Sequence, residues 1–434
     1  MKNIAVISLG CDKNRVDTEH MLYNAVRGGF AVSDIQDADV IIVNTCAFIE
    51  SARQESIDAI LSCAELKKTG KCKKLVVTGC LPQKYKAELI KELPEVDAFL
   101  GAFEYDRIAA VIDGDAECAA SGENCPFDAA ENGKRLLTTF PHVAYLKIAE
   151  GCNNKCTFCT IPSIRGGYRS RRTVDIVNEA EALCRDGVKE LILVAQDVTR
   201  FGSDRGESLI GLLDELEKTP VELIRLLYCY PECVTDELIE RIASSKKIAK
   251  YIDIPVQHGS DKILKLMNRR TTGGEVERVI NKLHDRGIVV RTTLMVGFPG
   301  EGEAEFAELC GLVERTKPEY AGIFAYSKED GTPAARLPDQ VKKSVKIKRV
   351  NALGKIAAEA TRAFNERLIG KTIDVVYEDV DYDRNMFIGR ADFQTPDVDG
   401  RVLFTASNVD VGNRYKVKIT DHDDYDLYGV LEGV

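Results

Sequence analysis

Residues 150–172 read EGCNNKCTFCTIPSIRGGYRSRR and place three cysteines, Cys152, Cys156 and Cys159, within eight residues. The next cysteine along the chain is Cys184. A structural metal site made only of protein ligands needs four, so this group stops one short. The cysteine spacing differs from the ferredoxin run, and no second CxxC pair or nearby histidine completes a zinc ribbon. The group therefore indicates a metal site with one open coordination position.

The stretch follows the first of six candidate strands that alternate with helical sequence. These strands begin at Val143, Glu190, Leu223, Tyr251, Val289 and Tyr320. Buried parallel strands read as continuous apolar runs, and their alternation with helices indicates βα units. We therefore predict an α/β fold with a (βα)6 partial barrel over residues 141–368. In such barrels the working residues follow the C-terminal ends of strands, where the three-cysteine stretch lies.

The first 117 residues contain a second set of three cysteines, each at the end of a strand-like run. NIAVISLGC ends in Cys11, ADVIIVNTC ends in Cys46, and KKLVVTGC ends in Cys80. The runs predict a parallel-sheet βα domain, in which strand ends share one edge of the sheet. Cysteine can also fill a core as a small hydrophobe. The recurrence of the same position three times favours a binding site over core filling.

The remaining segments differ in character from the two βα regions. Residues 118–140 are rich in Gly, Asn and Ser, which predicts a linker in which Cys118 and Cys125 are incidental. Residues 370–434 contain short strands and turns, which predict a small antiparallel, OB-like β-barrel. The other six cysteines, Cys63, Cys72, Cys184, Cys229, Cys233 and Cys310, are interpreted as structural.

Bulk composition narrows the class of protein. The chain has 434 residues, 14 cysteines and a net charge of −10. No apolar run is long enough for a membrane span, so we expect a cytoplasmic protein without membrane contact. Reducing conditions there make metal or redox chemistry a better explanation of the cysteines than disulfides. The net negative charge argues against a protein whose main role is to bind nucleic acid, because such binding usually needs a basic surface.

The CxxxCxxC spacing, with the aromatic Phe158 just before the last cysteine, resembles the radical S-adenosylmethionine enzymes. In that superfamily three thiolates, here Cys152, Cys156 and Cys159, ligate three irons of a 4Fe-4S cluster. S-adenosylmethionine takes the open position and is cleaved to a 5′-deoxyadenosyl radical. The resemblance thus implies an enzyme that removes hydrogen from unactivated carbon, which no side-chain base can do.

Over the whole chain, the order of the three domains is similar to that of the methylthiotransferases. In that family the N-terminal cysteines carry a second 4Fe-4S cluster implicated in delivering sulfur, and the C-terminal domain is a TRAM β-barrel. The resemblance assigns Cys11, Cys46 and Cys80 to the second cluster. It also implies S-adenosylmethionine as radical source and methyl donor, a reductant protein and a sulfur source.

Two branches of the family compete for this chain. Its segments SLGCDKNRVDTE, NTCAFIESARQESID, CTIPSIRGGYRSR and DIPVQHGSDKILKLMNR are similar to the ribosomal-protein aspartate methylthiotransferases. The tRNA branch tends to show QSGS where this chain has QHGS from Gln257. RGGYRSR varies within the family, so Arg165 and Arg169 receive no firm role. We expect methylthiolation of the β-carbon of an aspartate in a small-subunit ribosomal protein of the uS12 type. The alternatives are methylthiolation of tRNA adenosine and a non-catalytic iron–sulfur electron carrier.

The C-terminal segment supports the choice of a protein substrate. Residues 370–434 contain 7 Lys and Arg against 14 Asp and Glu. A barrel of this charge would repel RNA, so stable tRNA binding is not expected, whereas a basic ribosomal protein would be attracted. A solvated acidic surface is the alternative explanation of the same charge.

Five further residues are predicted to contact the cofactor: Phe158, Gln196, Asp197, Gln257 and His258. Gln196 and Asp197 end the run ELILVAQD, where a barrel places its ligand contacts, although Asp197 equally suits a cap on the following turn. His258 in VQHGS follows a strand end and is either a lining residue of the site or a core histidine with satisfied hydrogen bonds.

Overall fold

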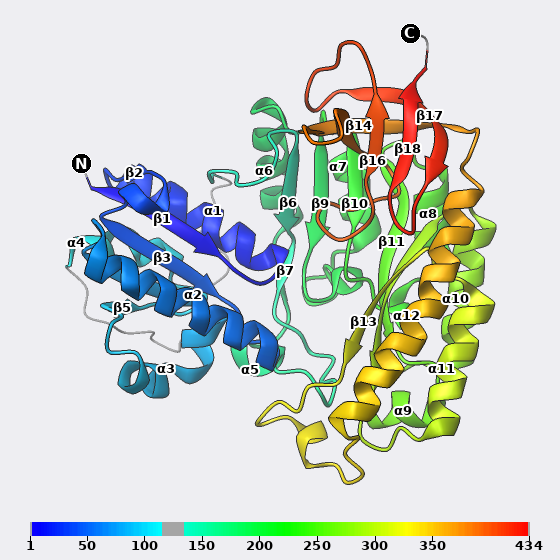
Figure 1. The fold of residues 1–434 in the computed structure, drawn as a ribbon, viewed down its shortest axis with the longest axis horizontal. Coiled ribbons are helices and arrows are strands. Elements are labelled where there is room, and N and C mark those ends of the chain that lie inside the picture. Colours follow the sequence, from blue (N-terminus) through cyan, green and yellow to red (C-terminus); the bar gives the residue numbers. More distant parts are fainter. Residues whose placement is uncertain (1, 115–133, 433–434) are drawn as a thin grey trace.

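The computed structural model describes residues 2–114 and 134–432, which form three domains in chain order (Figure 1). A parallel-sheet domain leads to a larger domain with a curved sheet, and a small barrel packs on the far end of that sheet (Figure 1). Most of the predicted linker 118–140, including Cys118 and Cys125, lies outside the described residues.

The N-terminal domain is a five-stranded parallel sheet of order β2-β1-β3-β4-β5. Its strands are β1 (Asn3–Ser8), β2 (Ala31–Val32), β3 (Val40–Thr45), β4 (Lys74–Gly79) and β5 (Ala98–Phe99). Its helices are α1 (Asp12–Arg27), α2 (Glu50–Thr69), α3 (Cys80–Glu92) and α4 (Ile108–Asp113), with 3-10 turns at Ile35–Asp37 and Tyr105–Arg107.

Both faces of this sheet are covered. Ile41 and Val43 pack on one face in a core that includes Ile60 of α2, whereas Ile42 packs on the other face in a core that includes Met21 of α1. Successive side chains of a strand point to opposite faces, so β3 must be apolar at consecutive positions. This explains why the strands appear in the sequence as unbroken apolar runs.

The second domain contains a six-stranded parallel sheet of order β13-β12-β11-β10-β9-β6. The strands are β6 (Val143–Lys147), β9 (Glu190–Val194), β10 (Leu223–Leu226), β11 (Ile248–Gln257), β12 (Val289–Val296) and β13 (Tyr320–Ala325). The sheet curves but stays open between β6 and β13, as a partial barrel does. A two-stranded ribbon, β7 (Ala149–Glu150) with β8 (Arg169–Ser170), flanks the three-cysteine loop.

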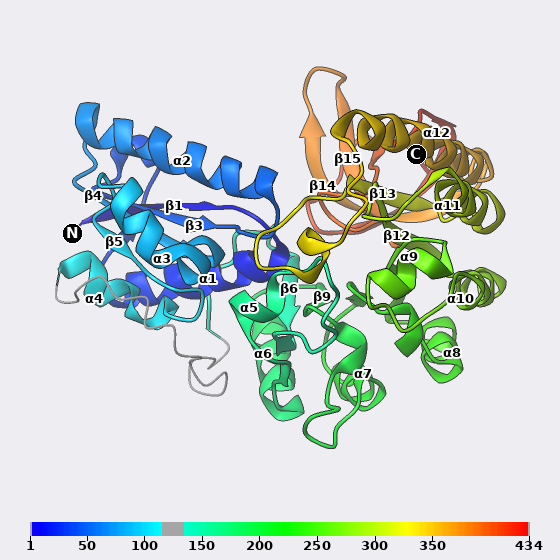
Figure 2. The same ribbon diagram turned by 90° about the horizontal axis from the view of Figure 1, so that it is seen from below.

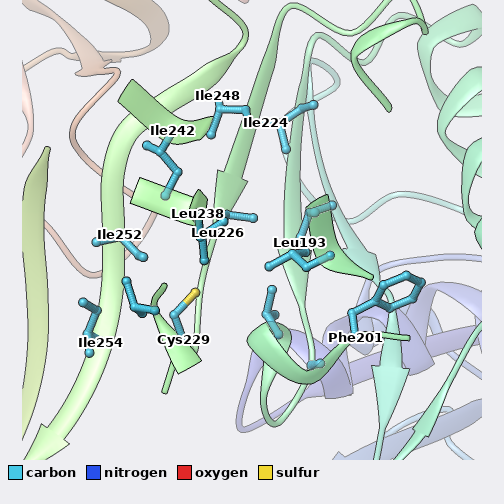
Figure 3. Packing of buried hydrophobic residues seen from close by; sticks show 14 of the residues in the cluster. Leu193, Phe201, Ile224, Leu226, Cys229, Leu238, Ile242, Ile248, Ile252 and Ile254 are labelled. Carbon is cyan, nitrogen blue, oxygen red and sulfur yellow. The ribbon is translucent and has the colours of Figure 1, made fainter. Parts of the chain in front are cut away.

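Helices surround the outside of the curved sheet (Figure 2). They are α6 (Thr173–Arg185), α7 (Leu209–Glu217), α8 (Asp236–Ser244), α10 (Gly273–Asp285), α11 (Glu303–Thr316) and α12 (Lys343–Glu366), with short α5 (Ile161–Arg165) and α9 (Asp261–Leu266) at the mouth. Short 3-10 turns lie at Val198–Arg200, Pro231–Cys233 and Pro333–Arg336. Ile224 and Leu226 of β10 point toward this helix layer and pack in one cluster with Leu238 and Ile242 of α8 (Figure 3).

The C-terminal domain is a closed barrel of order β14-β15-β16-β18-β17. Its strands are β14 (Thr372–Asp381), β15 (Met386–Ala391), β16 (Val402–Thr405), β17 (Arg414–His422) and β18 (Leu427–Leu431). The predicted small antiparallel barrel is confirmed, and one pair of its strands, β16 and β18, runs parallel. Five strands cannot alternate in direction all the way around a closed ring, so one parallel pair is unavoidable.

Buried ion pairs join this barrel to the second domain. Arg390 of β15 donates to both carboxylate oxygens of Glu190 on β9, at 3.2 and 2.6 Å. Arg225 of β10 donates to the same carboxylate at 2.8 Å. Glu190 begins its strand, so the barrel covers the N-terminal ends of the sheet and leaves the C-terminal ends facing the N-terminal domain.

Candidate functional site

Three strand ends bring Cys11, Cys46 and Cys80 to one edge of the N-terminal sheet. Ser8 pairs with Asn44, and Thr45 pairs with Gly79, so β1, β3 and β4 end in register. Cys46 directly follows β3, Cys80 begins α3 directly after β4, and Cys11 precedes α1. The structure therefore gathers the three cysteines that the sequence analysis grouped.

The Cys11 and Cys46 loops pack closely. Gly10 has a φ of +92°, and a Cβ at this position would lie 2.9 Å from Cys46 Cβ and 3.2 Å from Cys46 Sγ. A residue with a side chain would therefore both strain the backbone and displace the cysteine. Glycine at this position lets the Cys11 loop approach Cys46.

Burial controls the protonation of these thiols. Burial, with smaller contributions from negative charge on Cys11 and Cys80, raises the pKa of Cys46 to about 12. Burial also raises the pKa of Cys80, which the nearby Arg165 opposes. Thiols held in this way become thiolates when a metal displaces their protons.

The arrangement suits a cluster better than a single ion. Within residues 2–114 and 134–432, no three His, Cys, Asp or Glu side chains are placed to hold one metal ion. An iron–sulfur cluster spreads its thiolate ligands over several irons, so they stand farther apart than the ligands of one ion. Three soft thiol donors at one sheet edge fit that requirement.

Arg165 connects the two cysteine sites. This residue ends α5, six residues after Cys159, and its side chain is 2% exposed. Its Nη2 donates to Cys80 Sγ at 3.4 Å and to Asn14 Oδ1 at 2.6 Å. Its Nη1 donates to Asp17 Oδ2 at 2.8 Å and to a Glu150 carboxylate oxygen at 3.1 Å. A guanidinium from the second domain thus completes the surroundings of a cysteine in the first.

The contact between the two domains is a buried network of opposite charges. Lys147 of β6 donates to Asp17 and, at 3.3 Å, to Glu150. Burial alone would raise the pKa of Glu150, but Arg165 and Lys147 hold it at about 2. Glu150 directly precedes the three-cysteine loop, so the same network fixes the base of that loop.

The loop that carries Cys152, Cys156 and Cys159 is shaped by its own backbone. Gly151 has a φ of +77°, and a Cβ there would collide with the carbonyl oxygen of Gly167. The backbone N–H of Asn154 donates to Cys152 Sγ at 3.5 Å, and that of Ile161 donates to Cys159 Sγ at 3.4 Å. Hydrogen bonds aimed at cysteine sulfurs are what a cluster site needs to stabilise its negative charge.

Cys156 has side-chain partners as well. Arg269 Nη1 lies 3.9 Å from Cys156 Sγ, and Tyr230 Oη lies 3.9 Å from the same sulfur. Arg269 packs over the Tyr230 ring at 4.2 Å. Burial raises the pKa of the Cys159 thiol to about 12. The polar groups around this loop therefore fit three iron-bound thiolates.

Gln196 and Asp197 lie beside the three-cysteine loop. Gln196 Nε2 donates to Glu150 at 2.6 Å, while its buried Oε1 has no partner among the described residues. Asp197 accepts from Asn154 Nδ2 at 2.8 Å and from Arg200 Nε at 3.0 Å. Asp197 thereby holds the cysteine loop, and its contact with the cofactor stays a prediction.

His258, Gln257 and Phe158 occupy different surroundings. His258 is fully buried, accepts from the Ser260 N–H at 3.0 Å and lies 3.2 Å from Glu301. Both ring nitrogens are therefore engaged, which favours the core-histidine interpretation. Gln257 ends β11 with a left-handed φ of +72°, a conformation that persists where surrounding structure enforces it. Phe158 packs edge-on against Phe298 at 6.4 Å.

Sequence reasoning did not assign Arg165, Arg269 or Tyr230 to the site. Arg165 lies in the quoted stretch RGGYRSR, so its sequence position was visible, but its partners are 15 to 151 residues away. Arg269 and Tyr230 are likewise far from Cys156 in the chain. Nothing in the local sequence distinguishes them from other arginines and tyrosines.

The other described cysteines have mainly structural surroundings. Cys63 and Cys72 pack in the core of the N-terminal domain, and Cys229 packs among Leu226, Leu238 and Ile254 (Figure 3).

None of the helices within residues 2–114 and 134–432 has the length and apolar character needed to cross a membrane.

Three family models match successive parts of the chain. Residues 3–101 match an uncharacterised protein family, UPF0004; residues 146–313 match the radical SAM superfamily; and residues 369–431 match the TRAM domain. Membership of the radical SAM superfamily implies a 4Fe-4S cluster and S-adenosylmethionine as cofactors.

Similar proteins extend over nearly the full length. The chain is 45% identical over 438 residues to the ribosomal protein uS12 methylthiotransferase RimO of Trichlorobacter lovleyi, covering 98% of this chain and 97% of that protein. It is 46% identical over 444 residues to the protein of the same name from Acetivibrio thermocellus, covering 99% and 98%.

Among solved structures, the radical S-adenosylmethionine methyltransferase TsrM from Kitasatospora setae has a TM-score of 0.57 at 14% identity, covering 77% of each chain. The cobalamin-dependent radical enzyme OxsB has a TM-score of 0.52 at 13% identity, covering 82% of this chain and 56% of that one. At this identity the likeness concerns the fold alone.

Proposed function

Because the chain belongs to the family of the ribosomal protein uS12 methylthiotransferases, we propose that it methylthiolates the β-carbon of an aspartate in the small-subunit ribosomal protein uS12. A C–H bond at that carbon is replaced by a C–S bond to a methylthio group. The single observation that carries the proposal is the meeting of two three-cysteine sites across one buried contact, with Arg165 touching Cys80 on one side and following Cys159 on the other.

The two sites divide the work. Cys152, Cys156 and Cys159 would hold a 4Fe-4S cluster that, with S-adenosylmethionine, would supply a 5′-deoxyadenosyl radical to remove the hydrogen atom. Cys11, Cys46 and Cys80 would hold a second 4Fe-4S cluster that would supply sulfur, and a further S-adenosylmethionine would supply the methyl group. The reaction also requires a reductant protein and a source of sulfur.

The protein's own residues shape the two sites. Asn154 and Ile161 donate backbone N–H groups to Cys152 and Cys159, while Arg269 lies beside Cys156. Cys152 and Cys156 are buried, and excluding water from this loop protects a radical from side reactions. Glu150 accepts from Gln196 and is tied to the domain contact through Arg165.

Surface charge supports a basic protein as the substrate. The C-terminal barrel carries twice as many acidic as basic residues, and Asp421, Asp423 and Asp424 lie exposed on it. Such a surface attracts a basic ribosomal protein and repels a tRNA backbone. We therefore propose the ribosomal protein rather than tRNA as the substrate.

The test uses the protein reconstituted anaerobically with iron and sulfide. It is incubated with S-adenosylmethionine, a reductant and either uS12 or tRNA, and the products are weighed. A methylthio mass gain on the aspartate of uS12 is expected. A mass gain on tRNA alone would instead support methylthiolation of tRNA adenosine. Absence of 5′-deoxyadenosine would support a non-catalytic iron–sulfur electron carrier.

A further inference from the structure

Lys13 lies at the contact between the two cysteine sites. It is two residues from Cys11, in the first turn of α1, and is 6% exposed. Its Nζ lies 3.3 Å from the centroid of the Tyr228 ring. Tyr228 follows β10 at the C-terminal edge of the curved sheet, two residues before Tyr230, whose hydroxyl approaches Cys156 Sγ. Lys13 thus reaches from the sulfur-delivery side toward the radical side.

The Lys13 ammonium has no carboxylate partner among residues 2–114 and 134–432. The nearby acids are already engaged: Asp12 accepts from Tyr228 Oη at 2.9 Å, and Asp17 binds Lys147 and Arg165. Two neighbouring cations, Arg165 and Arg15, are paired, whereas Nε and Nη2 of Arg169 also lack hydrogen-bond partners among the described residues. Arg165 binds Asp17 and Glu150, and Arg15 binds Asp397 at 3.3 Å.

A largely buried lysine whose ammonium has no carboxylate partner among the described residues is costly, and this position adds to the cost. Burying a charge without a partner is unfavourable, and the Tyr228 ring offsets only part of that cost through its π face. The first turn of a helix carries partial positive charge, which disfavours a lysine and favours an anion. A carboxylate bound where the ammonium, the Tyr228 ring and the N-terminus of α1 meet would pair with the ammonium and offset this cost.

We propose that Lys13 binds the side-chain carboxylate of the target aspartate. The inference rests on the proposed function and names the residue that selects the substrate. The carboxylate is one bond from the β-carbon that reacts, so an ion pair at this point fixes that carbon between the two cysteine sites. Cys11 is exposed, which leaves access to this side of the contact. Asparagine in place of the aspartate would leave the ammonium unpaired and be rejected.

The test compares Lys13→Met, Lys13→Gln and Lys13→Arg in the anaerobic holoenzyme. The matched control is Lys71→Met, since Lys71 is an exposed lysine of the same domain that pairs with Asp37. The iron content per chain is measured for each variant. Of the two neutral variants, Lys13→Met and Lys13→Gln, one that retains the wild-type iron content is used for the binding and turnover measurements. Substrates are uS12 and uS12 with asparagine at the modified position. Binding is followed by fluorescence anisotropy, and turnover by mass spectrometry.

Loss of the ion pair is expected to weaken binding of uS12 by about tenfold to a hundredfold and to raise KM in parallel. The preference for aspartate over asparagine should fall by the same factor, because neither substrate then meets a positive charge. Lys13→Arg should recover part of the preference, and Lys71→Met should match the wild type.

Two results would overturn the inference while leaving the proposed function intact. One is an unchanged KM and an unchanged aspartate preference in the neutral variant. The other is a defect confined to the dependence on S-adenosylmethionine or sulfide concentration, which would assign Lys13 to a different anion. Failure of the wild-type protein to modify uS12 would instead refute the proposed function itself.

Discussion

Replacing Arg165 by methionine should destabilise the contact between the first two domains. The guanidinium is buried and donates to four acceptors: Cys80, Asn14, Asp17 and Glu150. Its removal leaves two buried carboxylates with Lys147 as their shared cation. Removing one partner of a buried ion pair costs about 3–5 kcal/mol, so the free energy of unfolding should fall by that amount.

The assay measures unfolding in urea, with circular dichroism as the signal. The matched control is Arg172→Met, because Arg172 is 53% exposed and pairs with Asp175 within one helix turn. An exposed pair of this kind contributes about 0.5 kcal/mol. Arg165→Lys should recover only part of the loss, since an ammonium cannot reproduce the planar fork of a guanidinium.

The pH dependence provides a second measurement of the Arg165 effect. In the folded protein the pKa of Glu150 lies at about 2, below its ordinary value of 4.5. The stability from the ionised carboxylate is therefore present above pH 4.5 and is lost as the pH falls toward 2. The difference between wild type and Arg165→Met should shrink over that interval. An Arg165→Met midpoint equal to that of Arg172→Met at pH 7 would refute the reasoning.

Three further variants test other parts of the structure. Cys11→Ala should hold about half the wild-type iron, whereas Cys310→Ala should hold all of it; equal iron in both would remove Cys11 from the second cluster. Gly151→Ala should lose the iron of the radical site, because the new Cβ collides with Gly167; full iron and normal 5′-deoxyadenosine formation would contradict this. Glu190→Gln should lower unfolding stability by about 3 kcal/mol at pH 7, because it leaves the buried Arg225 without a carboxylate partner and Arg390 with Glu378 alone. Its two arginines outweigh burial and hold the pKa of Glu190 at about 2, so the loss should shrink as the pH falls from 4.5 toward 2, and a loss that grows there would be inconsistent.

Much of the fold follows from local sequence. Apolar runs such as residues 40–45 predict buried parallel strands because their side chains enter cores on both faces of the sheet. The direction shared by parallel strands then places Cys11, Cys46 and Cys80 at one edge. The pairing of β16 with β18 was not predictable in this way, since strand direction within a closed barrel depends on the number of strands and the order of their connections.

The cysteines of the two sites could be named from the sequence, whereas most of their partners could not. Spacing identifies Cys152, Cys156 and Cys159 because neighbouring ligands must lie on one loop. Arg269 reaches Cys156 from 113 residues away, and no local pattern marks it. His258 shows the same limit: its sequence position suited a ligand contact, but its neighbours in space engage both ring nitrogens.

The sequence by itself determined the order of the three domains, the two incomplete sets of cysteines and the family to which they belong. These features depend on residue type and spacing along the chain, so they need no knowledge of the folded contacts. Only the tertiary structure decided that the two sites share one buried boundary, where Arg165 touches Cys80 and Lys13 lies over Tyr228. The physical reason is that the energy of a buried charge depends on the groups around it in space, and folding brings those groups together from distant parts of the chain.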